Sequence, residues 1–191
     1  IRFKDDGPDV SAVEGEVAKK VLDETDGLDT VSIGGGTIES LFATPAFGAD
    51  GEGTLSYTLS ATDGAQTGLW LTGESGPAAE IILVQNGTSF EGRAGGAGGD
   101  LAFTISINAD SGKVTIQQNA TLEHLKDGDK HNDALFLDGA AAISVTQHIV
   151  DGDGDTDSAT SDSALGIRFK DDGPDVSAVE GEVAKKVLDE T

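Results

Sequence analysis

The first 25 residues of the chain return without a single difference as its last 25. Residues 1–25 and 167–191 both read IRFKDDGPDVSAVEGEVAKKVLDET, and the two copies are 166 positions apart. Chance does not produce an identical run of this length, so we expect a tandem array of near-identical units. A period of 166 residues is far longer than the roughly 20–50 residues of a solenoid repeat. Each unit is therefore expected to fold as a whole domain.

A DDGP sequence at residues 5–8, and its copy 166 positions later, separates the units. Proline fixes φ and disfavours helix in the residue before it, so the Gly-Pro pair ends the strand that precedes it. We interpret residues 1–7 as the last strand and linker of a preceding repeat, and residues 8–172 as one complete β-sandwich domain. Residues 173–191, which are identical to residues 7–25, then begin the next repeat.

Short runs of alternating apolar and polar residues fill the unit. Residues 54–60 and 101–107 both place apolar side chains at every second position. This alternation is typical of β-strands with one buried face. After the turn at residues 108–112, Val114 and Ile116 continue the pattern, which predicts a hairpin. Further strands are expected at residues 69–72, 80–85, 88–93, 143–150 and 164–170.

The stretch after the first DDGP is ambiguous. Residues 10–13 and 17–22 are compatible with an edge strand, but valines spaced by four also fit a short helix over residues 14–24. We favour strand or loop, because the surrounding patterns are those of strands. Many short strands with Gly- and Asp-rich turns predict an all-β fold, namely an immunoglobulin-like β-sandwich. A unit of this size needs long loops or extra strands in such a fold.

The composition excludes several classes of binding partner and of metal site. The chain holds 12 Lys and Arg against 35 Asp and Glu, for a net charge of −23, which argues against nucleic acid and anionic membranes as partners. There is no run of about 18 apolar residues to span a membrane. Without cysteine there is no disulfide and no thiolate metal site. An acidic, Gly-rich and Cys-free β-pattern suits calcium-rich extracellular water, where cations bridge carboxylates.

The strongest motif is DGDGDTD at residues 151–157. Four carboxylates lie at every second position, and the intervening glycines let the loop bend tightly. Hard oxygen ligands on a flexible backbone suit Ca²⁺ better than a transition metal. Thr156 and Asp162 stand where an EF-hand requires Gly and Glu, so the loop is not an EF-hand. The alternative is a solvated acidic loop. The predicted metal ligands are Asp151, Asp153, Asp155 and Asp157.

A second candidate is the junction between repeats. Asp5 and Asp6 return as Asp171 and Asp172, and Glu14 follows the first pair. Carboxylates at a domain boundary can chelate calcium and stiffen the joint, whereas without metal they repel each other. The alternative is a polar linker.

The remaining motifs carry weaker signals. Residues 127–133 contain further carboxylates, but neighbouring lysines favour a plain surface turn. Residues 95–103 fit the Gly and Asp positions of a calcium β-roll repeat, yet one copy cannot stack, so a glycine-rich loop is expected. Trp70 is expected in a core strand rather than on a sugar-binding surface. There is no HExxH, G-x-S-x-G or P-loop pattern, and we do not expect an enzyme.

Two strings carry a resemblance to a known family. VDGDGDTDSA at residues 150–159, followed by IRFKDDGP at residues 167–174, resembles the tandem repeat of giant RTX adhesins. Type I secretion systems of Gram-negative bacteria export these proteins. The resemblance extends over essentially the whole period, and its other matching segments are residues 54–60, 68–71, 103–108, 111–115 and 121–125.

The resemblance implies a structural role. Repeats of that family are immunoglobulin-like or related β-sandwiches, called extender domains, with calcium at and near their joints. They hold a ligand-binding tip away from the outer membrane in adhesion and biofilm formation. The implied metal ligands are Asp151, Asp153 and Asp155, and the implied junction residues are Asp5, Asp6, Asp171 and Asp172.

The expected function is therefore a calcium-rigidified extender module on the bacterial cell surface. Its expected partners are neighbouring identical repeats and distal adhesive domains elsewhere in the parent protein. The alternative is a β-sandwich that itself binds glycan, ice or a surface, with affinity gained by avidity. Such a module should show exposed aromatic residues or a flat Thr-rich face, and only 5% of the residues are aromatic.

Overall fold

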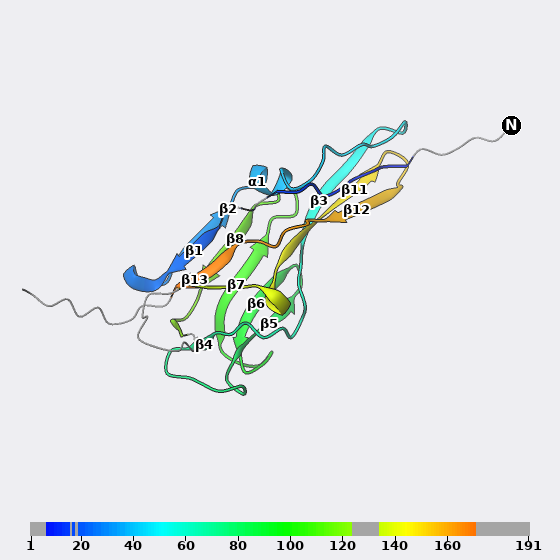
Figure 1. Ribbon diagram of the computed structural model, residues 1–191. Coiled ribbons are helices and arrows are strands. Elements are labelled where there is room, and N and C mark those ends of the chain that lie inside the picture. Colours follow the sequence, from blue (N-terminus) through cyan, green and yellow to red (C-terminus); the bar gives the residue numbers. More distant parts are fainter. Residues whose placement is uncertain (1–6, 16, 18, 124–133, 171–191) are drawn as a thin grey trace, which may run out of the picture.

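The structure is a computed structural model that describes residues 7–15, 17, 19–123 and 134–170. Within these residues the fold is all-β, as predicted (Figure 1). In the described residues, helical structure is confined to α1 (Gly35–Glu39) and two single 3₁₀ turns, η1 (Glu24–Asp26) and η2 (Gly139–Ala141). No helix in this part of the chain has the length and apolar character needed to cross a membrane.

The described strands form four sheets. The largest has the order β2-β8-β7-β6-β5, with β2 (Thr30–Ile33), β5 (Ile81–Asn86), β6 (Ser89–Ala94), β7 (Leu101–Ile107) and β8 (Val114–Gln118). A second has the order β12-β11-β3, with β3 (Glu52–Ser60), β11 (Ser144–Asp151) and β12 (Thr156–Thr160). The third is β1-β13-β10, with β1 (Lys20–Asp23), β10 (Ala134–Phe136) and β13 (Ile167–Lys170). The fourth pairs β4 (Trp70–Leu71) with β9 (Leu122–Glu123).

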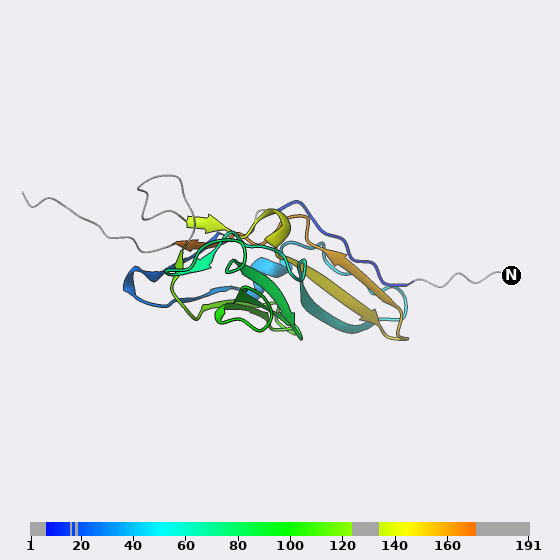
Figure 2. The same cartoon turned by 90° about the horizontal axis from the view of Figure 1, so that it is seen from below.

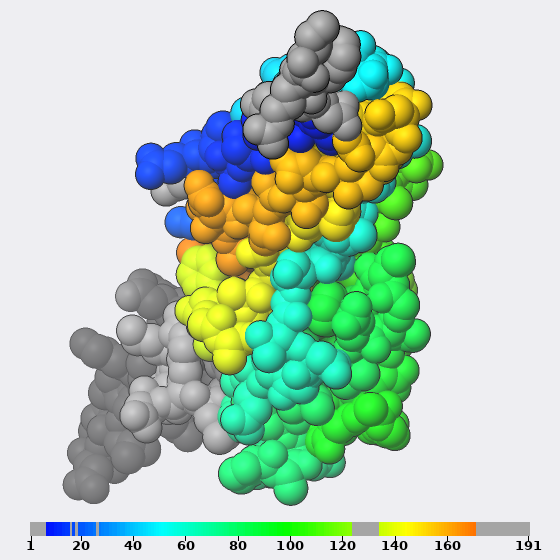
Figure 3. All heavy atoms as spheres, turned by 90° about the vertical axis from the view of Figure 1, so that its right-hand side faces the viewer, coloured from blue at the N-terminus to red at the C-terminus, as the bar shows by residue number. Residues whose placement is uncertain are grey.

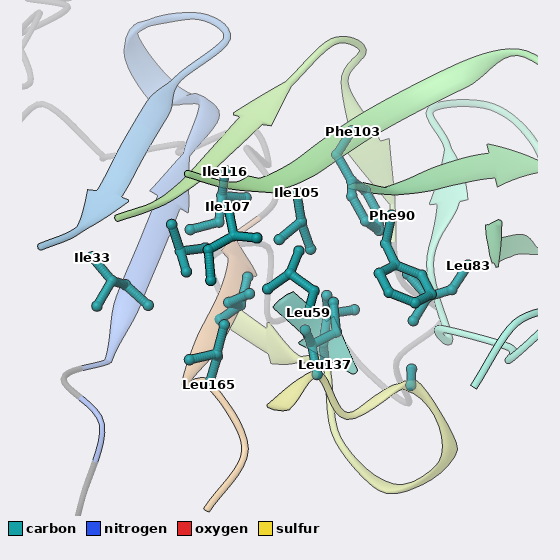
Figure 4. Close-up of a cluster of buried hydrophobic side chains, with 14 of the residues drawn as sticks. Ile33, Leu59, Leu83, Phe90, Phe103, Ile105, Ile107, Ile116, Leu137 and Leu165 are labelled. Atoms are coloured by element: carbon teal, nitrogen blue, oxygen red, sulfur yellow. The ribbon is translucent and has the colours of Figure 1, made fainter. Parts of the chain in front are cut away.

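The core lies between two layers, in a β-sandwich-like arrangement. Figure 2 shows the green strands of the five-stranded sheet on one side and β10 and β13 on the other. Side chains from β5, β6, β7 and β8 meet Leu59, Leu137 and Leu165 from the opposite layer (Figure 4). The rings of Phe103 and Phe169 pack with their centroids 4.6 Å apart. Burying each such side chain contributes about 1.5–3 kcal/mol relative to exposure, so these contacts hold the layers together.

The expected strands are largely present. Residues 54–60 lie in β3, with Tyr57 and Leu59 buried, and the hairpin of β7 and β8 is confirmed. Trp70 lies in β4 and is only 8% exposed, which confirms its place in the core. The glycine-rich stretch that begins at Gly95 is the turn between β6 and β7, also as expected.

The edge-strand interpretation of the N-terminal segment is confirmed only in part, because β1 is an edge strand of its sheet whereas the residues before it are not. Residues 10–13 form no continuous strand, and isolated bridges join Asp9 to Ala46 and Ala12 to Phe42. Within residues 14–24, the described part contains β1 and the beginning of η1, with no α-helix. Of residues 7–13 only Val10 is buried, so this segment lies along the surface. Figure 3 shows its dark blue atoms against the yellow and orange β11–β12 hairpin.

Four of the described strands were not predicted, namely β2, β9, β10 and β12. β12 has the sequence TDSAT, without the bulky apolar residues that mark a buried strand, whereas β2, β9 and β10 are only two to four residues long. All four lie at sheet edges, where one neighbouring strand supplies the pairing. The strand conformation of β12 therefore depends on pairing with β11 more than on intrinsic preference.

Gly92 tests the packing between strand and core. A Cβ at Gly92 would collide with the ring of buried Phe103. We predict that Gly92→Ala lowers the free energy of unfolding by about 1–3 kcal/mol, because overpacking forces the ring to move. The measurement is the urea midpoint at unchanged slope. The control is Gly98→Ala, since Gly98 is exposed with open space around it; equal midpoints for the two variants would contradict the packing described.

Candidate metal centre

The DGDGD loop connects β11 to β12 and is organised by its first carboxylate. The backbone N–H groups of Gly154 and Asp155 donate to Asp151 Oδ1 at 3.1 and 2.8 Å. The N–H of Asp151 donates to the carbonyl of Asp155 at 3.0 Å. Gly154 has φ of +103°, a conformation that a side chain strongly disfavours. The Asp and Gly residues thus produce a tight turn around the Asp151 side chain, which is only 4% exposed.

A second loop brings a third carboxylate that sequence reasoning missed. Ligand oxygens of Asp50, Asp151 and Asp153 all lie within 4.8 Å of one another. Asp50 precedes β3, whose antiparallel pairing with β11 places the two loops side by side. The N–H of Gly152 donates to the carbonyl of Gly51 at 3.0 Å. A Cβ at Gly152 would collide with the carbonyl of Asp50, so glycine permits this approach.

The three residues contribute differently to this acidic cluster, which we define as Asp50, Asp151 and Asp153. Asp151 is buried, whereas Asp50 and Asp153 are exposed. The second oxygen of Asp151, Oδ2, is buried without a hydrogen-bond partner among the described residues. An unsatisfied buried carboxylate oxygen is costly, and a cation or a shared proton would satisfy it.

The pKa values of Asp151 and Asp153 shift in opposite directions because the two carboxyl groups interact. Burial alone would raise the pKa of Asp151, but interaction with the Asp153 carboxyl and with backbone N–H groups outweighs it and holds this pKa below its usual value. The same interaction with Asp151 raises the pKa of Asp153. The two carboxylates therefore resist being ionised together, and a divalent cation relieves this repulsion.

The cluster fits a hard cation. Its side chains offer only carboxylate oxygens, and they come from two loops. Ca²⁺ takes six to eight oxygen ligands in flexible geometry, so Asp50, Asp151 and Asp153 would supply part of such a set. It is the one group of three possible metal-ligating side chains within the described residues.

The other predicted ligands lie beside the N-terminal segment. Asp155 is exposed, and its Oδ2 lies 3.8 Å from where a Cβ on Gly7 would be. Asp157 belongs to β12 and accepts a hydrogen bond from the N–H of Val10 at 2.8 Å. Glu14 is exposed and is not part of the cluster. Asp5, Asp6, Asp171 and Asp172, and the predicted turn at 127–133, lie outside the described residues.

The structure thus brings together two of the predicted carboxylates, adds Asp50, and places two others next to residues 7–10. The only local signal for Asp50 is the Asp-Gly pair before a strand, and such pairs are common in turns. Only the register of β3 against β11, with Asp151 opposite Glu52, identifies it.

Comparison with known proteins gives one match. The model of a family described as Domain of unknown function (DUF5801) matches residues 19–164, about three quarters of the chain. This range begins directly before β1 and ends between β12 and β13. No curated protein and no solved structure matches.

Removing one exposed carboxylate tests the cluster. We predict that Asp50→Asn and Asp153→Asn each weaken calcium affinity about ten-fold, because charge count sets the affinity of such sites. Both side chains are exposed, so the variants should fold. The measurement is calorimetric calcium titration of the purified chain.

The matched control is Asp110→Asn, in the exposed turn between β7 and β8. Its titration should equal that of the unmodified chain. If Asp50→Asn titrates like this control, Asp50 is not a ligand.

Proposed function

The chain belongs to the family described as Domain of unknown function (DUF5801), and for this member we propose the role of a structural extender module in a bacterial surface adhesin. In this proposal each repeat is an immunoglobulin-like β-sandwich that Ca²⁺ rigidifies. The parent protein is an RTX-type adhesin, exported by type I secretion to the cell surface of a Gram-negative bacterium. The array projects a distal ligand-binding region, in adhesion and biofilm formation, and the module is not an enzyme.

The observation that carries the proposal is the position of the acidic cluster relative to the repeat boundary. Gly7 lies near Asp155, and Val10 is bonded to Asp157. These N-terminal residues directly follow Asp5 and Asp6 of the DDGP sequence. The loop that holds the cluster therefore lies where a preceding repeat would join this one.

The tether between consecutive repeats is short. β13 ends at Lys170, and Gly173 is the copy of Gly7. Three residue steps span at most about 11 Å of extended chain. If repeats follow the boundary at residue 172, the last strand of each ends close to the acidic cluster of the next. The carboxylates of the tether, Asp171 and Asp172, then add to that cluster.

Such a concentration of negative charge makes the joint dependent on cations. Like charges a few ångströms apart repel strongly when partly shielded from water. Bridging Ca²⁺ would turn this repulsion into a rigid connection, with Kd of roughly 10⁻⁴–10⁻³ M typical of extracellular sites. In calcium-poor cytosol the array would stay loose for export. Its partners are neighbouring repeats and distal adhesive domains, with no role for nucleic acid or membrane insertion.

A second candidate function is favoured by the outer face of the β12-β11-β3 sheet. Residues paired directly across strands share a face, and on the side away from the core nine of the eleven positions are Ser or Thr. Thr146 pairs with Thr160 through hydroxyls 2.8 Å apart, and Thr58 contacts His148 at 2.9 Å. The nine residues are Thr54, Ser56, Thr58, Ser60, Ser144, Thr146, Thr156, Ser158 and Thr160.

This hydroxyl face is rich in Thr and Ser, as a module that binds ice or ordered glycan requires. Strands about 4.8 Å apart place its hydroxyls in regular rows. A single face of this size binds weakly, so an array would act by avidity.

Calcium removal tests the extender proposal. We predict that the melting temperature of the chain falls by roughly 5–10 °C when EDTA replaces millimolar Ca²⁺, because a ligand that binds only the folded state stabilises it. For two consecutive repeats, X-ray scattering should show a maximum dimension that shortens in EDTA. The Asp50→Asn variant should respond less to EDTA. An unchanged melting temperature and dimension would reject the proposal.

The hydroxyl face is tested by an ice-affinity assay and a glycan array on tandem repeats. If it binds, Thr146→Lys in its central strand should abolish retention, because a long charged side chain breaks the flat surface. Thr62→Lys, in an exposed loop outside the face, is the control of equal charge. Absence of retention for the unmodified repeats would reject this second function.

A further inference from the structure

The first and last described strands of the unit lie side by side and run in the same direction. β1 pairs in parallel with β13, with Lys20 opposite Ile167 and Asp23 opposite Lys170. On its other side β13 pairs with β10, in antiparallel orientation. The strand that ends the unit is thus held between two others, one of them the first strand of the same unit.

A parallel pair of terminal strands has a mechanical consequence. In a tandem array, tension enters each unit through the residues before β1 and leaves through the residues after β13. The entry pulls on the Lys20 end of β1, and the exit pulls on the Lys170 end of β13. Because the strands are parallel, these ends lie at opposite ends of the pair (Figure 1). The two strands are pulled past each other along their axes.

Loading in this direction strains all the rungs of the pair together. An antiparallel terminal pair would instead be pulled at one end and would open one hydrogen bond at a time. Forced unfolding is governed by the unfolding rate, so breaking several interactions in one step gives greater resistance than breaking them in series. The β1–β13 pair is in the resistant geometry.

The side chains of the pair add to this resistance. Leu22 and Ile167 are fully buried, and Phe169 is 1% exposed against Phe103. Sliding β13 by one position would turn these apolar side chains out of the core, since alternate residues of a strand point to opposite faces.

The end of the pair carries an ion pair. Lys170 Nζ donates to Asp23 Oδ2 at 2.6 Å. The hydrogen bond from Lys170, with a second from Thr25, lowers the pKa of Asp23 to about 2, so this carboxylate is charged at neutral pH. At the opposite end, the N–H of Lys20 donates to the carbonyl of Gly166 at 2.8 Å. The β1–β13 pair thus has polar contacts at both ends and buried apolar side chains between them.

We propose that the parallel β1–β13 pair is the force-bearing element of the repeat, loaded in shear when the array is under tension. The residues before β1 give way first, because isolated bridges at Asp9 and Ala12 hold them. The load then rests on the pair. This inference rests on the extender function for its biological meaning, while the shear geometry belongs to the single unit.

The test is single-molecule force spectroscopy in two pulling directions. The chain contains no cysteine, so introduced cysteines define the attachment points without competition. The first direction pulls from both chain ends, which shears the pair. The second pulls from the C-terminal end and from Leu28→Cys. Leu28 is half exposed and follows β1, so this direction peels the pair open from the Asp23 end.

We predict an unfolding force about two-fold or more higher in the shearing direction, because its hydrogen bonds break together. Equal forces in the two directions would overturn the proposal. Repeating both in Ca²⁺ and in EDTA separates the two ideas. If the unfolding force differs between the two directions and EDTA does not change it, the force-bearing role of the β1–β13 pair is supported and the calcium role is rejected. If EDTA lowers the unfolding force strongly and the two directions give equal forces, the calcium role is supported and the force-bearing role of the pair is rejected.

A variant isolates the ion pair. Lys170→Ala should shorten the lifetime of the unit under constant shearing force about two- to five-fold, in line with the small contribution of exposed ion pairs. Lys113→Ala, at an exposed lysine beside the β7–β8 turn, is the matched control and should leave the lifetime unchanged. Equal lifetimes for the two variants would show that Lys170 does not contribute to the resistance of the β1–β13 pair.

Discussion

The antiparallel ladder between β3 and β11 is the contact on which most of the molecule depends. Its register runs from Ser144 opposite Ser60 to Asp151 opposite Glu52. One face of the ladder supplies Leu59 and Val145 to the core, and the other is the hydroxyl face. The irregularity at its end, between Val150 and Asp151, turns Asp151 into the loop beside Asp50. A slip of one residue would exchange the two faces and separate these loops.

The acidic side chains of the chain are concentrated near the end of this ladder. Three carboxylates meet at one end of the ladder, and Asp155 and Asp157 line the path of the N-terminal segment. Two glycines allow the carboxylates to lie this close together. Gly152 lets the backbones of the two loops approach each other, and Gly154 adopts the positive φ that the turn requires. Part of the net charge of −23 is thus concentrated at one end of the ladder.

Local patterns predict most of the strands and part of the site. The alternation in 54–60 and 101–107 identifies β3 and β7 because one face of each is buried. The DGDGD motif marks the loop of Asp151 and Asp153. β12 escapes prediction because pairing with β11, not its own composition, holds it in a sheet. Asp50 escapes because it is about a hundred residues from its neighbours in the chain, and ladder register carries no local signal.

The sequence by itself determines the repeat, its period, the all-β character and the residue types available for calcium, since these depend on identity, alternation and composition. It also shows that residues 167–170 are a copy of residues 1–4. Only the tertiary structure decides that this copy pairs in parallel with β1, that Asp50 joins the acidic cluster and that nine hydroxyl side chains share one face. Each of these depends on which strands become neighbours, which the packing of the whole core selects.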